Sequence, residues 1–417
     1  MNNIKIKEIV GHAGQANILV YDPGTSDSRS KICICMMYGS SRATDKLQNP
    51  FMKRFALMGY RAANCAPRNG FFIDQVQWFS ECQKLIRQNV SGVEKIILWG
   101  NSRGCNLTSA YQRIAENGAQ TFQGPDMFLP IPDMELIPAD GIIHCDANYG
   151  FMVNHIISLA SNLKDDYVVC DRTSPELDPI APENGYDPGT GAAKYDEDFS
   201  RAVMKAQAKR YNRLLKLAQQ RMELIKAGKG MFKDDEPFTV VMGFGNVNTY
   251  QMYTHDVRFF SRTNKPQNLV HKDGTITNEI VKTVRGPKKI PEDWECIDKG
   301  FQTRVSEYLY CGMHVNEDEF YYDETGVYGV ELDNNFTSAQ GNAAYISCPT
   351  LAVGRTDGFE FIVAELIVDR SIADIKECIF IEGMTHAGDC NDPEKYGDVV
   401  ALEYNYIDSW LCKTYNI

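Results

Sequence analysis

Residues 97–104 read Ile-Leu-Trp-Gly-Asn-Ser-Arg-Gly, and this stretch decides the fold. The apolar residues at its start predict a buried strand, and the apolar periodicity of residues 105–114 predicts a helix. A strand, a Gly-x-Ser-x-Gly turn and a helix in this order are the setting of a nucleophile elbow. Gly100 and Gly104 suit such a turn, because the positions two before and two after the serine must be nearly free of side chain. We therefore predict Ser102 as a nucleophile at the start of a helix, whose dipole favours developing negative charge.

Strand and helix signals alternate on both sides of this turn, up to residue 150. Because such alternation implies parallel strands joined by crossover helices, we expect an α/β fold with a mostly parallel central sheet. Besides the strand before Ser102, the segments concerned are strands at residues 4–10, 16–21, 31–37, 60–66 and 139–145, and helices at residues 51–58 and 72–88.

The alternation stops at residue 151 and returns at residue 346. In between, the clearest signal is a long helix at residues 199–227, whose apolar residues recur at spacings of four and three. The returning elements are strands at residues 345–353 and 375–381 and helices at residues 360–369 and 394–411. We therefore divide the chain into a first part of the core (1–150), a large, mainly helical cap inserted after the sixth strand (151–345) and a second part of the core (346–417).

Composition narrows the classes of function. The 417 residues carry a net charge of −12, which disfavours binding to nucleic acid or to an anionic membrane. No apolar run is long enough for a transmembrane span, and the first residues lack the apolar core of a signal peptide. The 13 cysteines are scattered and odd in number, which indicates reduced thiols in a cytoplasmic protein. We expect a small-molecule substrate as the partner and leave a homodimer open.

The predicted base for Ser102 is His386. Of the seven histidines, only His386 lies beyond the strand predicted at residues 345–353, in a glycine-bounded loop just past the last predicted strand. In folds with a nucleophile elbow, the catalytic residues follow one another in the order serine, acid, histidine. The alternative interpretation of His386 is an exposed loop residue without a catalytic role.

Four carboxylates compete for the position of the acid that orients His386. Asp357 is the first choice, because it ends a predicted strand and is followed by the turn residue Gly358. A carboxylate there can hold the imidazole tautomer and stabilise the imidazolium, although an Asp in this position also commonly caps the next helix. The alternatives are Glu360 and Glu365 on that helix, and Asp146 at the end of the strand at residues 139–145.

An oxyanion hole needs two backbone N–H donors. The N–H of Arg103, directly after the nucleophile, is the first candidate, and the N–H of Ser40, in the loop after the strand at residues 31–37, is the second. Such donors typically contribute several kcal/mol of transition-state stabilisation.

Taken together, these elements resemble the α/β-hydrolase superfamily. The insertion is also similar to the caps of a subgroup of large bacterial members, in the Ser-Pro-x-Leu-Asp-Pro stretch at residues 174–179 and the Asp-Asp-Glu-Pro-Phe stretch at residues 234–238. In that subgroup the turn after the seventh strand often has a Glu further on in place of the Asp, so the resemblance favours Glu360 and Glu365. The core motifs that carry the likeness are Gly39-Ser40 after an apolar strand, the elbow at residues 100–104, Gly354-x-x-Asp357 and Gly383-Met-Thr-His386.

The function that these residues predict is that of a serine hydrolase, which cleaves a carboxylic ester or a related acyl bond through an acyl-enzyme. Hydrolysis of a C–C bond in a diketone uses the same residues and stays open, as does a catalytically silent binding module. Aromatic residues in and near the insertion indicate a small apolar or aromatic substrate, although aromatic side chains equally often form a core. They are Tyr149, Phe151, Tyr186, Phe244, Tyr250 and Tyr253.

Two other classes of enzyme are less well supported by the sequence. A metal hydrolase would have to use His144, Asp146 and His155, but no His-Glu-x-x-His or paired Cys-x-x-Cys motif accompanies them. A dinucleotide enzyme would have to use Gly243-Phe-Gly245, which lacks the third glycine of the fingerprint and its strand–helix setting. We therefore expect neither a metal nor a cofactor.

Overall fold

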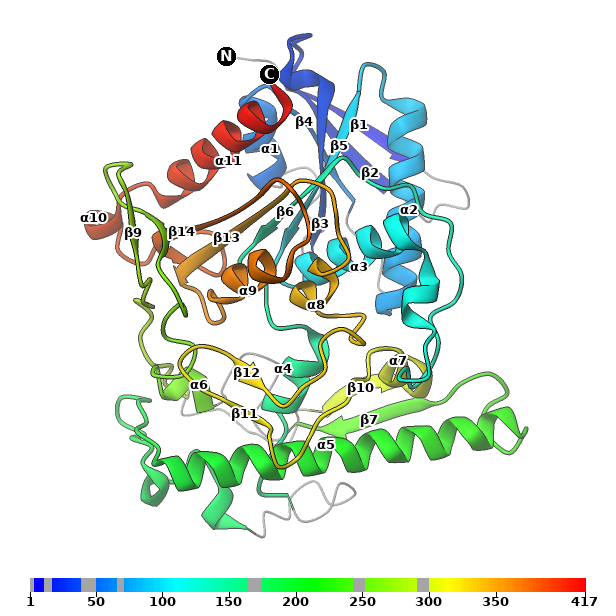
Figure 1. Cartoon of the computed structure of the whole chain (residues 1–417), viewed down its shortest axis with the longest axis vertical. Coiled ribbons are helices and arrows are strands. Elements are labelled where there is room, and N and C mark those ends of the chain that lie inside the picture. The colour runs from blue at the N-terminus through cyan, green and yellow to red at the C-terminus, as the bar shows by residue number, and fades with distance from the viewer. Residues whose placement is uncertain are drawn as a thin grey trace.

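The computed structural model describes residues 4–10, 17–38, 50–65, 71–163, 174–242, 252–290 and 300–417. Its centre is a ten-stranded sheet (Figure 1). In their order across the sheet, the strands are β1 (Lys5–Val10), β2 (Asn17–Asp22), β4 (Arg61–Asn64), β3 (Ile32–Tyr38), β5 (Lys95–Asn101), β6 (Gly141–Cys145), β13 (Thr350–Asp357), β14 (Lys376–Thr385), β8 (Gln267–Val270) and β9 (Ile276–Glu279).

The middle of this sheet is parallel. Every neighbouring pair from β4 to β8 runs in the same direction, whereas β1, β2 and β9 are antiparallel to their neighbours. The prediction of an α/β fold with a mostly parallel central sheet is therefore confirmed. The carboxyl ends of β5, β6 and β13 lie side by side at one edge, because these three strands are consecutive in the sheet.

Helices cover both faces of the sheet. One face carries α1 (Pro50–Leu57) and α11 (Val399–Tyr415), and the other carries α2 (Phe72–Asn89), α3 (Arg103–Asn117) and α9 (Val363–Arg370). Side chains alternate between the faces with the period of two that a strand imposes. In β3, for example, Ile34 packs with the first group of helices and Cys35 with the second, and both are fully buried.

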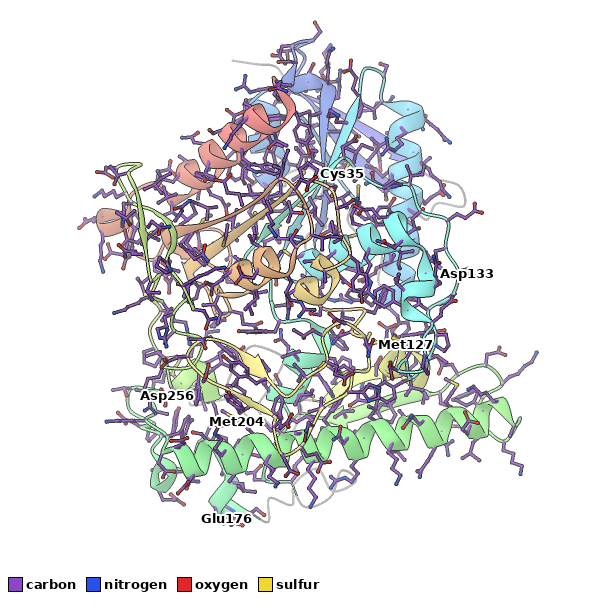
Figure 2. The ribbon with its side chains drawn as sticks, viewed as in Figure 1. Cys35, Met127, Asp133, Glu176, Met204 and Asp256 are labelled. Carbon is purple, nitrogen blue, oxygen red and sulfur yellow. The ribbon has the colours of Figure 1, made fainter. Side chains whose placement is uncertain are left out.

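Most of the insertion forms a second layer below the sheet in Figure 1, and α5 (Glu197–Lys226) runs along its outer side. Asp196 caps α5, because its side chain accepts a hydrogen bond from the backbone N–H of Phe199 at 2.7 Å. Met204 points inward from the helix and accepts from the Tyr322 N–H (Figure 2). The other elements of this layer are α4 (Phe151–Ile157), β7 (Pro237–Val241), α6 (Met252–His255), β10 (Gly300–Arg304), α7 (Val305–Tyr310), β11 (Tyr321–Tyr322) and β12 (Val327–Tyr328). The last helix of the insertion, α8 (Ala339–Ala343), packs against α3 and α9 instead.

Part of the insertion belongs to the central sheet, which the sequence did not predict. The hairpin of β8 and β9 adds to the edge of β14, with Leu269 opposite Phe380 in a parallel ladder. Pairing of this kind satisfies the backbone groups that an exposed edge strand would leave open. The strands have only four residues each, and all four side chains of β9 are exposed, so no buried apolar run marks them in the sequence.

The end of the chain also differs in detail from the sequence prediction. Residues 394–411 were expected to form one helix, but they are divided between the short α10 (Pro393–Tyr396) and α11. Gly397 separates the two helices with a φ of +75°, a value that favours glycine. Of the helices in the described ranges, none combines the length and the apolar character that a membrane span requires.

Candidate active site

Ser102 occupies a sharp turn between β5 and α3. Its φ of +57° and ψ of −129° are unusual for a residue with a side chain, and its backbone N–H donates to the carbonyl of Cys145 at 3.1 Å. A Cβ added to Gly100 would lie 2.6 Å from the backbone nitrogen of Cys105. Only glycine therefore fits at this position of the turn, as the sequence motif predicts.

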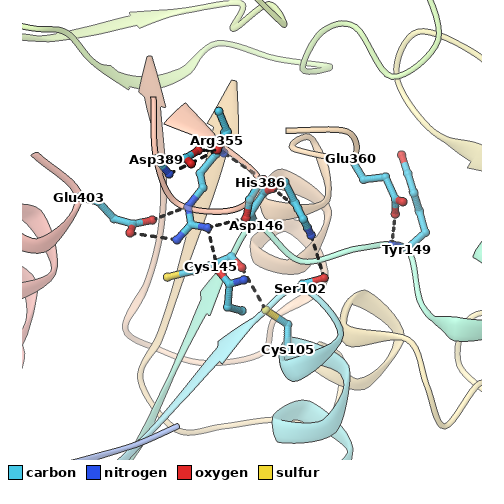
Figure 3. A network of polar contacts seen from close by, with 12 residues as sticks. Ser102, Cys105, Cys145, Asp146, Tyr149, Arg355, Glu360, His386, Asp389 and Glu403 are labelled. Carbon is cyan, nitrogen blue, oxygen red and sulfur yellow. Dashed lines mark hydrogen bonds and ion pairs between the residues drawn. The ribbon is translucent and has the colours of Figure 1, made fainter. Parts of the chain in front are cut away.

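Ser102, His386 and Asp146 form a continuous chain of hydrogen bonds (Figure 3). His386 follows β14, and its Nε2 lies 2.9 Å from Ser102 Oγ. Its Nδ1 lies 2.5 Å from Oδ2 of Asp146, a residue that is 1% exposed and follows directly after β6. Because Asp146 accepts at Nδ1, the arrangement favours the tautomer in which Nε2 is free to accept the serine proton.

The backbone around Asp146 holds its carboxylate in place. The residue has a φ of +46°, and its N–H donates to the Val353 carbonyl at 2.7 Å. Its second carboxylate oxygen, Oδ1, accepts from the backbone N–H of Arg355 at 3.1 Å. Gly358 leaves the space that the carboxylate needs, because a Cβ added there would lie 2.5 Å from Oδ2. The glycine that the sequence suggested as a turn residue thus also makes room for Asp146.

The structure does not bring the first-choice acid, Asp357, to His386. Its carboxylate accepts a hydrogen bond from the Asn391 side chain at 2.8 Å, and burial raises its pKa. Strand order alone does not exclude Asp357, because β13 is the direct neighbour of β14, the strand that His386 follows. The local backbone makes the difference: Asp146 adopts a φ of +46° directly after β6 and contacts His386, whereas the Asp357 carboxylate is bonded to Asn391.

The two glutamates also have other partners. Glu360 accepts from the backbone N–H of Tyr149 at 2.6 Å, and burial raises its pKa to about 7. Glu365 accepts from the backbone N–H of Asn264 at 2.8 Å and from the Gln267 side chain at 2.9 Å. Both carboxylates thus tie segments of the chain together, and Asp146 is the candidate acid that contacts His386.

Only one of the two predicted oxyanion donors can be placed. Arg103 is the first residue of α3 and directly follows Ser102. Its side chain lies over the ring of Phe72. Burial lowers the pKa of its guanidinium, and the nearby carboxylate of Glu307 on α7 only partly offsets this by raising it. The other candidate, Ser40, lies outside the described residues.

A buried ion pair lies behind the site, and sequence analysis assigned it no role. Arg355 in β13 contacts Glu403 in α11 through two hydrogen bonds of 2.9 and 3.0 Å, and both side chains are fully buried. Burial alone would lower the pKa of Arg355, but Glu403 outweighs it and raises the pKa above its usual value. A Glu on the apolar face of the closing helix is the one signal in the sequence that could have indicated this pair.

The residues of the alternative metal site have different environments. Asp146 contacts His386, and His155 contacts the hydroxyl of Tyr308 at 3.1 Å. His144 is buried in β6, and burial lowers its pKa to about 3. Within the described ranges, no three His, Cys, Asp or Glu residues are grouped as metal ligands would be. Gly243-Phe-Gly245, the candidate dinucleotide motif, lies outside those ranges.

Comparisons with other proteins find similarity in structure. No protein-family model matches the chain, and no curated protein matches it significantly. The structure of DcsB in complex with its substrate analogue aligns with 99% of this chain and 99% of its own length, at 9% identity and a TM-score of 0.44. The α/β hydrolase GrgF from Penicillium sp. sh18 aligns over 98% of each chain, at 13% identity and a TM-score of 0.43.

Esterase B from Lactobacillus Rhamnosis aligns over a smaller part, 36% of this chain and 49% of its own length, at 12% identity and a TM-score of 0.28. This chain thus spans about half the length of that esterase. Two features of this chain's own structure identify its fold, the strand order and the turn at Ser102. On these two features, with His386 after the strand next to β13, the chain has the fold of the α/β-hydrolase superfamily.

Proposed function

We propose that this protein is a serine hydrolase, in which Ser102 is the nucleophile, His386 the general base and Asp146 the acid that orients it. The observation that carries the proposal is the unbroken chain of hydrogen bonds from Ser102 Oγ through His386 to Asp146, at 2.9 and 2.5 Å. A nucleophile within hydrogen-bond reach of a base, which is itself oriented by a third group, is the arrangement that nucleophilic catalysis requires.

The proposed reaction has two steps. Ser102 Oγ attacks the carbonyl carbon of an ester while His386 Nε2 takes the hydroxyl proton, and the bond to the leaving alcohol breaks as His386 returns that proton to it. Water then attacks the acyl-enzyme, with His386 again as the base, and releases the acid and Ser102. The negative oxygen that forms in each step would accept from the N–H of Arg103 and from a second donor, for which Ser40 remains the proposed residue.

The proposed substrate is a small carboxylic ester with an apolar or aromatic part. The ring of Phe359 lies 6.1 Å from the His386 ring and 6.5 Å from the ring of Tyr253 in the insertion. An aromatic side chain beside the base favours apolar groups through buried area. Tyr253, one of the aromatic residues singled out from the sequence, is thus linked to His386 through Phe359. Phe244 and Tyr250 lie outside the described residues.

The first prediction concerns the nucleophile. A fluorophosphonate probe should label the protein at Ser102, and Ser102→Ala should abolish the labelling, since the probe reacts with an activated serine hydroxyl. Mass spectrometry of the labelled peptide identifies the site. Ser26→Ala, which removes an exposed serine away from the site, serves as the control and should label like the wild type. Equal labelling of the Ser102→Ala variant would contradict the proposal.

The two alternatives predict different results in the same series. A silent binding module would leave Ser102 unlabelled and hydrolyse none of a panel of p-nitrophenyl and phenyl esters. A C–C hydrolase would be labelled at Ser102 but would cleave a β-diketone faster than any of these esters. Hydrolysis of the esters, lost in Ser102→Ala, is the result expected under our proposal.

A further inference from the structure

Arg355 lies where three segments of the candidate site meet. It belongs to β13, between β6 and β14, and its side chain is fully buried. Glu403, 48 residues later on α11, holds the guanidinium through Nε and Nη2 at 2.9 and 3.0 Å. This paired geometry leaves the third nitrogen, Nη1, directed toward the site (Figure 3).

Each segment that carries a member of the Ser–His–Asp chain is bonded to Arg355. Nη1 donates to the side-chain oxygen of Asn101, the residue before Ser102, at 2.7 Å. The same nitrogen donates to the backbone carbonyl of His386 at 3.0 Å. The backbone N–H of Arg355 donates to Asp146 Oδ1 at 3.1 Å. One residue thus fixes the elbow, the histidine loop and the acid relative to one another.

A general role in stability does not by itself account for this arrangement. Replacing a buried ion pair by well-packed apolar residues is often neutral or stabilising, because two charges must be taken out of water. The guanidinium also presents several donors in a rigid plane, which the single ammonium of a lysine cannot reproduce. If apolar residues replaced Arg355 and Glu403, the contacts of Arg355 with Asn101 and His386 would be lost. These contacts therefore point to a role beyond stability.

We propose that Arg355 is a positioning residue of the hydrolase, held in place by Glu403, and that it sets the distance between Ser102 and His386. This inference rests on the proposed function. It assigns Arg355 no contact with the substrate: its effect passes through the Asn101 side chain and the His386 carbonyl. Since a misplacement of about 1 Å in an active site can lower the rate by about 10²-fold, loss of these contacts is expected to reduce the chemical step rather than binding.

Two variants test the proposal by independent routes. Arg355→Lys keeps the positive charge but cannot bond to Glu403, Asn101 and His386 together. The double variant Arg355→Met/Glu403→Leu replaces both charged side chains by apolar side chains of similar volume. It is expected to fold even if Arg355→Lys does not, because no unpaired buried charge is left. Arg113→Lys is the matched control. Arg113 is an equally buried arginine that donates to the carbonyls of Asp333 and Thr121, far from Ser102 in the fold.

The first measurement is the rate of fluorophosphonate labelling at saturating probe, together with the probe concentration for half-maximal rate. We expect either Arg355 variant to lower the maximal rate by about 10²-fold with little change in that concentration. The second measurement is the strongly downfield proton resonance of the short His386–Asp146 hydrogen bond, which needs no turnover. It should broaden or shift in the Arg355 variants and remain in Arg113→Lys.

Two results overturn the inference. The first is a folded Arg355 variant that is labelled at the wild-type maximal rate. The second is a loss of labelling rate that Arg113→Lys shows as well, while the His386–Asp146 proton resonance stays unchanged. The proposed function fails separately, when the wild-type protein itself is not labelled at Ser102. Loss of rate together with a changed resonance, in either Arg355 variant and not in the control, supports the positioning role.

Discussion

Ser102 and Asp146 share an uncommon backbone conformation. Both have a positive φ, at +57° and +46°, and in the described residues only two other non-glycine residues do, Phe260 and Asn416. Such conformations cost on the order of 1–3 kcal/mol each and persist where the surrounding structure fixes them. Here each residue directly follows one of two neighbouring parallel strands, so both side chains lie at the same edge of the sheet.

Replacing each candidate acid in turn should show whether Asp146 or Asp357 orients His386. We expect Asp146→Asn to lower kcat by roughly 10⁴, because an amide at this position stabilises the wrong tautomer of His386. Asp357→Asn, whose partner is Asn391, is the matched control and should stay within a few-fold of the wild type. Steady-state kinetics with a p-nitrophenyl ester measures both. The opposite pattern would return Asp357 to the role that the sequence first suggested.

A single methyl group at residue 358 should also affect the site. In Gly358→Ala the new Cβ would press on both carboxylate oxygens of Asp146, at 2.5 and 2.8 Å, so the carboxylate must move away from His386. We expect kcat to fall roughly 10- to 100-fold with KM nearly unchanged. Gly124→Ala is the control, because a Cβ there meets nothing within 4 Å. Unchanged kcat in Gly358→Ala would show that the acid tolerates the shift.

Ser102, His386 and the four candidate acids could be named from the sequence, but the one acid that contacts His386 in the structure could not be chosen from it. Asp146 and Asp357 both stand at the carboxyl end of an apolar strand, and both precede His386. The strand order would favour Asp357, since β13 is the direct neighbour of β14, but the local backbone at the end of each strand brings Asp146 to the histidine. One residue of the sequence does bear on this choice. Gly358 has no side chain, and a Cβ at this position would collide with the carboxylate of Asp146.

Glu360 connects two elements rather than acting on His386. It lies just before α9 and accepts from the N–H of Tyr149, in the loop between β6 and α4. With the Asn154 side-chain amide turned so that its nitrogen faces the carboxylate, Glu360 also accepts from Asn154 in α4. Burial raises the pKa of Glu360 to about 7, from an ordinary value of 4.5. The folded protein therefore keeps a proton on Glu360 at pH values where the unfolded chain has lost it.

This difference predicts a pH-dependent effect of Glu360→Gln. Between about pH 4.5 and pH 7 the folded state binds more protons at this group, so Glu360 lowers the free energy of unfolding as the pH rises. Glutamine does not titrate and can keep the bond to Tyr149, so the variant should gain stability relative to the wild type over that range, by at most about 3 kcal/mol.

Urea unfolding at a series of pH values measures this gain. Glu223→Gln, on the exposed side of α5, is the control and should run parallel to the wild type. A difference between Glu360→Gln and the wild type that does not change between pH 4.5 and pH 8 would mean that the carboxylate stays ionised in the fold.

Periodic elements were predictable, and short ones were not. The helix expected at residues 199–227 is α5 at residues 197–226, because a long apolar stripe with a capping acid is a strong local signal. The hairpin of β8 and β9 has no such signal. It becomes a pair of strands because the edge of β14 offers hydrogen-bond partners, which is a property of the tertiary fold.

At the scale of the whole molecule, the insertion and the sheet share one hydrophobic core. A continuous cluster of buried side chains includes Cys35 in β3, Tyr111 in α3, and Leu215 and Tyr308 from the insertion. Since elements that share a core lose their packing together, we expect the two parts of the chain to unfold in one transition.

A variant in the insertion should therefore shift the unfolding of the entire molecule. Leu215→Ala, at a buried position of α5, is expected to cost about 2–5 kcal/mol, whereas Leu224→Ala, on the same helix but 37% exposed, should cost much less. Calorimetry and near-UV circular dichroism should report the same single, lowered midpoint for Leu215→Ala. Two separate transitions, of which only one moves, would show that the insertion unfolds independently.

The pair of Arg355 and Glu403 has a consequence for the synthesis of the protein on the ribosome. A ribosome releases the members of the site in the order Ser102, Asp146, Arg355, His386, Glu403. The partner of Arg355 is thus the last of them to leave the exit tunnel, on the helix that closes the second face of the sheet. If Ser102 is the nucleophile, as proposed, we expect its hydroxyl to stay unactivated through most of translation and activity to begin only when α11 has docked and Glu403 holds Arg355.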